Sequence, residues 1–152
     1  MEMMTAQLIP KATVFAVGLI FLGGLELQAA KAPLDPEELK EQSAMIIAGE
    51  VLEVRSKAQR SKIASGVGIH RDRVYHIRVR VAAVAKGAQV KPGDEIEVVA
   101  WKPICRIPPQ AGLQGHEQIP KAGDKATFYL KGKDGQAFKP ILPNGIEIAK
   151  AK

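Results

Sequence analysis

The sequence predicts a mainly β domain, built as a small closed barrel of five strands behind a short helix. Two long runs are rich in β-branched residues, at 44–55 and 73–85, and the second alternates between apolar and polar side chains. Glycine, proline and asparagine punctuate the later apolar runs, as expected for short strands joined by turns. About 120 residues follow position 30, which is the size of one ordinary domain.

A short helix is predicted over residues 34–41. Asp35 can cap its amino end, and Pro36 suits the first helical position. Glu38 stands three residues after Asp35, as in a capping box. Acidic residues in the first turn also interact favourably with the helix dipole.

The first two strands are predicted to flank a basic loop. Strand one covers 44–55, and Gly49 inside it indicates a bulge or a sharp bend. Residues 56–71 combine basic residues with glycines and are expected to form a mobile loop. Strand two, at 73–85, should place two sets of side chains on opposite faces. These are Tyr75, Ile77, Val79 and Val81 on one face, and His76, Arg78 and Arg80 on the other.

Strand three is predicted at 95–101, after a turn over 87–94. The next stretch, 102–120, holds four prolines and two glycines and is expected to be long and irregular. Strand three should direct alternate side chains inward and outward. The inward residues are Ile96, Val98 and Ala100, and the outward residues are Glu95 and Glu97.

Two shorter strands complete the predicted barrel. Strand four covers 125–131, and a Gly-Lys-Asp-Gly hairpin signal leads into strand five at 137–142. Pro140 restricts strand five to an edge or a bulge, and residues 146–148 close the chain. A shared core is expected because a one-residue slip in register would expose the whole apolar set. Its members are Ile77, Val79, Ile96, Val98, Phe128 and Leu130.

Five strands, a bent first strand and a short helix fit an OB-like barrel, with an open sandwich as the competing fold. The runs 43–54 and 75–81, followed by the turn at 86–87, resemble the opening strands of netrin-like domains. This OB-fold module is shared by tissue inhibitors of metalloproteinases and related secreted proteins. The resemblance, over residues 43–101, implies the fold and export. Those inhibitors use an N-terminal cysteine and several disulfides that this chain lacks, so bacterial secreted proteins with the same strand pattern are the closer comparison.

Residues 1–30 are predicted to be a signal peptide. Residues 12–25 form an uncharged run of about 14, within the roughly 7–15 of a signal core and short of the roughly 20 that span a bilayer. Small residues then permit cleavage after Ala30 or Ala32. Residues 31–152 should therefore form a single OB-like barrel domain that is secreted or periplasmic. An uncleaved signal anchor is the alternative.

Charge is distributed unevenly along the chain. Residues 1–50 hold three basic and seven acidic groups, net −4, whereas residues 51–152 hold nineteen and nine, net +10. This balance permits binding to an anionic polymer, to lipid headgroups or to an extracytoplasmic protein. With one Trp, two Tyr and four Phe, the chain offers few platforms for stacked bases, so no nucleic-acid module is predicted. The single cysteine excludes an internal disulfide framework.

The basic loop after strand one is the predicted anion contact. No acidic residue occurs between Glu53 and Asp72, so the loop cations have no acidic neighbour in sequence. A solvated loop is the preferred interpretation of this stretch, and among the basic features it is the better candidate for an anion contact. The candidate ligand-binding residues are Arg55, Lys57, Arg60 and Lys62.

Strand two carries a second basic stripe, at His76, Arg78 and Arg80. If strands two and three form a hairpin, the two arginines lie opposite Glu97 and Glu95. Cross-strand pairs of opposite charge ordinarily stabilise a sheet. The stripe is therefore interpreted as structural, with an anion site as the alternative.

Trp101, Cys105 and His116 share the long Pro/Gly segment. A thiolate–imidazole pair could act as a nucleophile or as two ligands of copper or zinc, with His70 or His76 as a third ligand. Metal-binding Cys-x-x-Cys and His-x-x-x-His spacings are absent, as are Gly-x-Ser-x-Gly and a phosphate loop. The sequence thus predicts no metal site, no cofactor and no enzyme. It predicts a binding or structural module of unknown ligand, with a netrin-like inhibitor and a thiol or metal site at Cys105 and His116 as alternatives.

Overall fold

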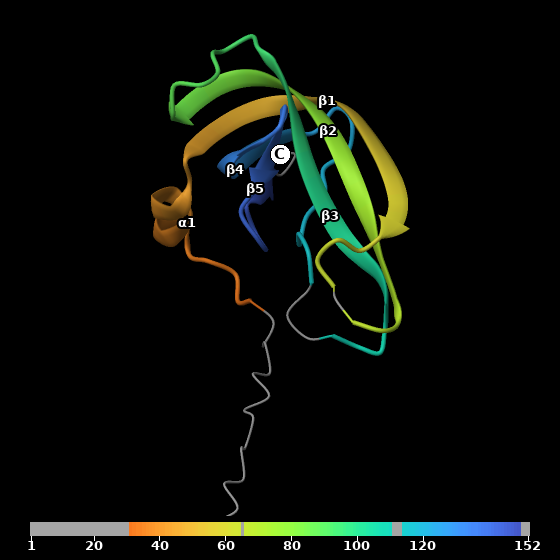
Figure 1. Ribbon diagram of the computed structural model, residues 1–152. Helices are drawn as coiled ribbons and strands as arrows, with labels where there is room; N and C mark the ends of the chain where they lie inside the picture. The colour runs from red at the N-terminus through yellow and green to blue at the C-terminus, as the bar shows by residue number, and fades with distance from the viewer. Residues whose placement is uncertain (1–30, 65, 111–113, 150–152) are drawn as a thin grey trace, which may run out of the picture.

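The domain is mainly β. The computed structural model describes residues 31–64, 66–110 and 114–149, so the predicted signal peptide at 1–30 lies outside the described residues (Figure 1). None of the helices in these ranges is long and apolar enough to cross a membrane. The elements in chain order are α1 Pro36–Gln42, β1 Met45–Arg60, β2 Ile69–Lys86, β3 Glu95–Ile107, β4 Lys125–Asp134, β5 Ala137–Pro140 and β6 Ile146–Ile148.

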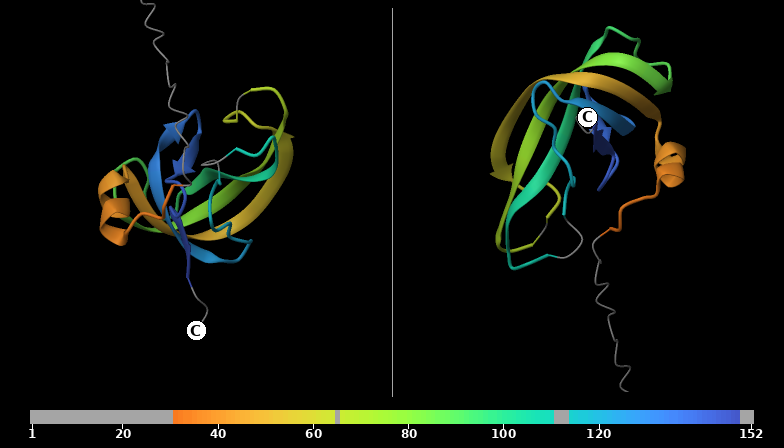
Figure 2. Two further views of the ribbon diagram at one scale, coloured as in Figure 1. Left: turned by 90° about the horizontal axis from the view of Figure 1, so that it is seen from below. Right: turned by 180° about the vertical axis from the view of Figure 1, so that it is seen from behind.

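Five strands of one sheet close into a ring. Their order is β1-β2-β3-β5-β4, and β1 also pairs with β4. β3 and β5 are parallel where Val98 meets Phe138, and the other pairings are antiparallel. β6 adds a short antiparallel pairing to β4. Figures 1 and 2 show β1, β2 and β3 as one long curved layer, with the shorter strands on its concave side.

The predicted core is confirmed. β2 alternates buried and exposed residues over most of its length, as its sequence pattern indicates. Side chains from β1, β2, β3, β4, β5 and β6 meet in one buried cluster inside the ring. All six predicted members belong to it: Ile77, Val79, Ile96, Val98, Phe128 and Leu130.

The short helix has the predicted cap. The Asp35 carboxylate accepts hydrogen bonds from the backbone N–H groups of Glu37 (2.9 Å) and Glu38 (2.8 Å), which completes a capping box with the Glu38 side chain. Leu39 is buried in a second, smaller cluster with residues of β1 and β4. The helix therefore lies against the outside of the ring.

Gly49 allows β1 to pair on both sides. The β1–β2 register shifts between Ala48 and Gly49, as predicted for a bulge. A Cβ at Gly49 would lie 2.5 Å from the carbonyl oxygen of Arg80, so only glycine permits this approach of the two backbones. Residues 45–50 can then pair with β4 while the rest of β1 continues along β2.

Three strands are longer than the sequence predicts. β1 continues to Arg60 and β2 begins at Ile69, so the predicted loop 56–71 is wrong at both ends. β3 continues to Ile107, so the first part of the predicted irregular stretch is also strand. We call β1 residues 55–60, β2 residues 69–76, the connection between these two strands and β3 residues 99–107 the arm. Arm residues pair across the three-strand layer, beyond the β1–β4 and β3–β5 pairings that close the ring.

At the other end of the chain, β4 and β5 differ from the prediction by a few residues. β4 extends three residues past Lys131, and β5 stops at Pro140 instead of continuing to Leu142. The β4–β5 register shifts between Leu130 and Gly132, next to Pro140. This irregularity agrees with the expectation that Pro140 tolerates only an edge or a bulge.

β3 and β4 begin from the same kind of four-residue turn, Lys-x-Gly-Asp. In the turns at 91–94 and 121–124, the aspartate carboxylate accepts a hydrogen bond from the lysine N–H, at 2.8 and 2.7 Å. The aspartate carbonyls accept from the N–H groups of Val81 and Val51, both at 2.9 Å. These hydrogen bonds attach the two turns to β2 and β1 and so determine where β3 and β4 begin.

Phe128→Ala should lower the free energy of unfolding by about 3–5 kcal/mol, because the ring is fully buried and its removal leaves a cavity. Val67→Ala is the control, since Val67 is 97% exposed and its truncation should change stability by less than about 0.5 kcal/mol. Urea denaturation measures both. A loss below about 1 kcal/mol for Phe128→Ala would contradict the assignment of its strand face.

Candidate anion-binding surface

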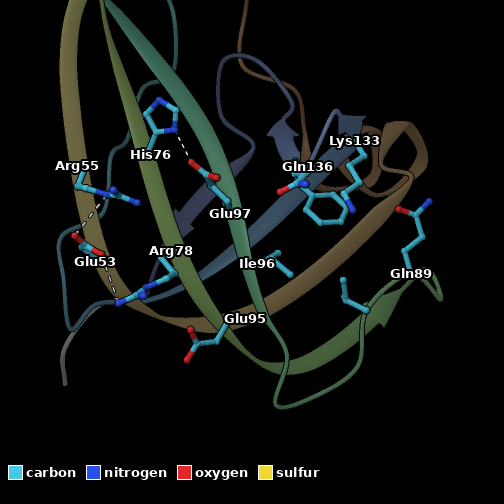
Figure 3. Close-up of a pocket in the computed structure, with 12 residues that line it drawn as sticks. Glu53, Arg55, His76, Arg78, Gln89, Glu95, Ile96, Glu97, Lys133 and Gln136 are labelled. Carbon is cyan, nitrogen blue, oxygen red and sulfur yellow. Dashed lines mark hydrogen bonds and ion pairs between the residues drawn. The ribbon is translucent and has the colours of Figure 1, made fainter.

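The polar face of β1, β2 and β3 carries a groove of about 430 Å³ (Figure 3). Lys133 and Gln136, from the end of β4 and the β4–β5 turn, form one side, and Gln89 follows the end of β2. Alternate residues of three neighbouring strands supply the charged wall. They are Glu53 and Arg55 on β1, His76 and Arg78 on β2, and Glu95 and Glu97 on β3.

The charges of this groove are largely paired with one another. Glu53 contacts both Arg78 (3.4 Å) and Arg55 (3.5 Å). His76 Nδ1 lies 2.5 Å from Glu97, and Arg80 lies 3.2 Å from Glu95. The wall therefore presents alternating charge and not a cationic stripe.

The predicted cross-strand ion pairs are confirmed for Arg80 and corrected for Arg78. The register does place Arg78 opposite Glu97 and Arg80 opposite Glu95. Arg78 also lies opposite Glu53 on its other side, because β2 is the middle strand. The Arg78 guanidinium pairs with Glu53, which leaves Glu97 to His76.

The predicted basic loop is mostly strand. Arg55, Lys57 and Arg60 lie on β1, and only Lys62 lies in the connection to β2. Strand alternation places Arg55 and Lys57 on the face of the groove and Arg60 on the opposite face. The four predicted residues thus follow one edge of the arm and do not form one loop surface. All four are exposed.

Strand pairing brings three further cations close to the four predicted ones. Arg60 lies directly opposite Arg71, and Arg73 lies directly opposite Lys102. Like charges at directly opposed positions of a sheet repel each other. No pattern in the sequence marks Arg71, Arg73 and Lys102 as a group, because only the register of the longer strands brings them opposite other cations.

The acidic residue within the arm is buried and paired with another arm residue. Asp72 is buried and forms an ion pair with Arg106, which is also nearly buried. Arg106 Nη1 additionally donates to the carbonyl oxygens of Arg71 (2.8 Å) and Cys105 (2.9 Å). This network occupies the irregular step where Asp72 pairs with Pro103. Asp72 therefore cannot neutralise the surface cations.

The arm is consequently strongly cationic. Residues 55–76 and 99–107 together hold eight basic residues and one acidic residue, a net charge of +7. Arg55 contacts Glu53, and Arg106 contacts Asp72. Within the part of the chain that the structure describes, the other six form no ion pair: Lys57, Arg60, Lys62, Arg71, Arg73 and Lys102.

Trp101, Cys105 and His116 do not share a loop. Trp101 and Cys105 lie on β3, and Cys105 is opposite Arg71. His116 contacts Trp101, which precedes Cys105 by four residues on β3. Among the described residues, no three His, Cys, Asp or Glu side chains are grouped as a metal site requires. The geometry thus joins Trp101 to His116 and leaves Cys105 apart.

Comparison with known proteins returned no match. No family model, no curated protein and no solved structure is significantly similar to the chain. Its function is therefore inferred from its own residues, pairing register and charge distribution.

His116 fastens the segment after β3 to that strand. Its backbone N–H donates to the Trp101 carbonyl (2.9 Å), and its Nδ1 accepts from the Trp101 N–H (3.2 Å). Gly115 permits this approach, since a Cβ there would lie 2.5 Å from the Trp101 oxygen. Burial lowers the pKa of His116 below 6.5, although the Pro140 and Trp101 carbonyls, which would accept hydrogen bonds from the protonated ring, partly oppose this effect. The neutral imidazole thus holds the segment after β3 against that strand, and we call this contact the His116 latch.

The stability of the domain should fall as the pH drops through about 6.5. The unfolded chain takes up the His116 proton there, whereas the folded domain does so only at lower pH. The contribution is therefore complete above 6.5 and decreases by at most about 1.4 kcal/mol per pH unit below it. His116→Gln should flatten this part of the curve of unfolding free energy against pH. If the curves of unfolding free energy against pH ran parallel for the two proteins, His116 would not stabilise the domain through its neutral form.

Proposed function

We propose that the chain is an exported, non-enzymatic binding module with an OB-like barrel, and that its arm binds an anionic partner. Closure of the ring between β1 and β4, with β3 parallel to β5, supports the OB-like reading. In OB folds, the face of strands two and three and the loops after strands one and four form the usual ligand surface. The arm cations lie on β1, β2, β3 and the connection after β1, which overlaps this region.

The observation that carries the proposal is the pairing of like charges across the arm. Arg60 opposes Arg71 and Arg73 opposes Lys102, and Asp72 is already paired with Arg106. Such positions destabilise a sheet when nothing lies between them, and the Lys102 ammonium donates only to a neutral acceptor, the Glu117 carbonyl (2.8 Å). A bound anion converts this repulsion into attraction through charge-assisted hydrogen bonds. Local arrangements that lower stability in this way are typical of binding sites.

Export provides the setting for this function. The uncharged run 12–25 and the small residues at 28–32 support a signal peptide, and the domain then acts in the periplasm or outside the cell. The netrin-like resemblance supports the same fold and compartment. The separation of Cys105 from His116 gives no support to a thiol or metal enzyme.

Arg60→Glu combined with Lys62→Glu should abolish binding of dextran sulfate, a soluble anionic polymer, while unfolding free energy changes by less than about 0.5 kcal/mol per site. Binding by the unchanged domain should weaken steeply as salt is added, because screening weakens exposed charge contacts. Retention on immobilised polymer measures both effects.

Two control variants make this test specific. Lys91→Glu with Lys121→Glu makes the same charge change in exposed turns outside the arm and should retain binding. Arg78→Glu with Arg80→Glu should damage folding, because the new carboxylates would face Glu53 and Glu95. If this last pair removed binding from a folded domain while the arm pair had no effect, the groove would be the ligand surface and the proposal would be wrong.

A further inference from the structure

The far end of the arm exposes large aliphatic side chains. Among the described residues, the exposed large hydrophobic side chains all lie at this end, with exposed fractions between 47% and 97%. They come from the β1–β2 connection, the first residue of β2 and the last part of β3. We call Ile63, Val67, Ile69, Ile104 and Ile107 the tip patch.

A strand pairing and hydrogen bonds in the β1–β2 connection position residues of the tip patch. Ile69 lies opposite Ile107 in the β2–β3 pairing. Ser61 Oγ accepts hydrogen bonds from the N–H groups of Ile63 (3.2 Å) and Ala64 (3.0 Å), which shapes the connection after β1. Figures 1 and 2 show this end of the arm at an extremity of the molecule, on the side away from α1.

Unpaired cations border the tip patch. Arg60 and Lys62 precede Ile63, and Arg71 follows Ile69 by two residues. None of these three forms an ion pair within the described ranges, and Asp72 is buried against Arg106. Isolated exposed aliphatic residues are ordinary, but several at one end of a domain mark an interaction surface.

Exposed aliphatic side chains bordered by unpaired cations fit one class of partner best. A soluble anionic polymer would occupy the cations and leave the aliphatic side chains in water. Nucleic acid would need exposed aromatic rings for stacking, whereas Tyr75 and Trp101 of the arm are half-buried. Asp72 is buried against Arg106. Asp134, which interacts electrostatically with Lys62, is paired with Lys139. Cations beside aliphatic side chains match the boundary between the phosphates and acyl chains of an anionic bilayer.

We propose that the arm docks on the surface of an anionic phospholipid bilayer, with the tip patch inserted among the acyl chains and the arm cations on the lipid phosphates. The proposal rests on the anion-binding function of the arm and names its partner class. The aliphatic contribution separates it from simple binding of any polyanion.

The test uses the chain starting at Lys31 and vesicles of phosphatidylcholine with or without about one third phosphatidylglycerol. The unchanged chain should co-sediment with the anionic vesicles and not with pure phosphatidylcholine. Ile63→Ser with Val67→Ser should weaken vesicle binding at least about tenfold and leave dextran sulfate binding unchanged. Ala82→Ser with Ala85→Ser, at exposed positions toward the other end of β2, is the matched control and should bind vesicles normally.

The possible failures are distinguishable. If the serine variant at the tip binds vesicles as well as the unchanged chain, or if the chain binds dextran sulfate but no vesicles, the bilayer proposal is wrong and the anion-binding function stands. If Arg60→Glu with Lys62→Glu leaves binding to both probes intact, or if neither probe binds, both proposals are wrong. Thermal unfolding of each variant shows that the domain is still folded.

Discussion

The pairing between β1 and β2 is the constraint on which the rest of this structure depends. It runs from Ile46 opposite Lys86 to Arg60 opposite Arg71 without a break longer than a bulge. The first residues of β1 also pair with β4 and close the ring, while its last residues project into the arm. One strand therefore contributes to the hydrophobic core at one end and positions basic side chains at the other.

Strand pairing gives these cations a fixed spacing that a loop would not provide. A charged side chain on a mobile loop loses backbone freedom when it binds, whereas the arm backbone is already ordered by its ladder. Burial of Asp72 against Arg106 has a second effect, since it removes the acid nearest to Arg71 and Arg73 from the surface. The charges that remain exposed on the arm are therefore cationic.

The sequence predicted the part of the fold in which apolar and polar residues alternate. The faces of β2, the first part of β3 and β4 followed from their two-residue period, and the helix cap followed from Asp35 and Glu38. A two-residue period appears only where one face of a strand is buried. Residues 56–60 and 102–107 lack it and were therefore not predicted as strand. Much of the arm is exposed or only half-buried, so its strands lack a regular apolar period and are specified by pairing with β2.

The candidate site was predictable only in part for the same reason. Clustering in sequence identified Arg55, Lys57, Arg60 and Lys62. Arg71, Arg73 and Lys102 are distant in sequence, and only the register brings them opposite one another or opposite Arg60. The burial of Asp72 depends on Arg106, far along β3, and no local pattern signals it.

Amide hydrogen exchange of residues 55–60 tests the central claim most directly. If these residues pair with 71–76 as described, about every other amide in the segment should be hydrogen-bonded and exchange far more slowly than in an unstructured peptide. The amide of the adjacent Lys62, which follows the last pair of the ladder, provides an internal comparison in the same spectrum. Exchange across 55–60 at the rate of an unstructured peptide would contradict the arm and the cation arrangement that depends on it.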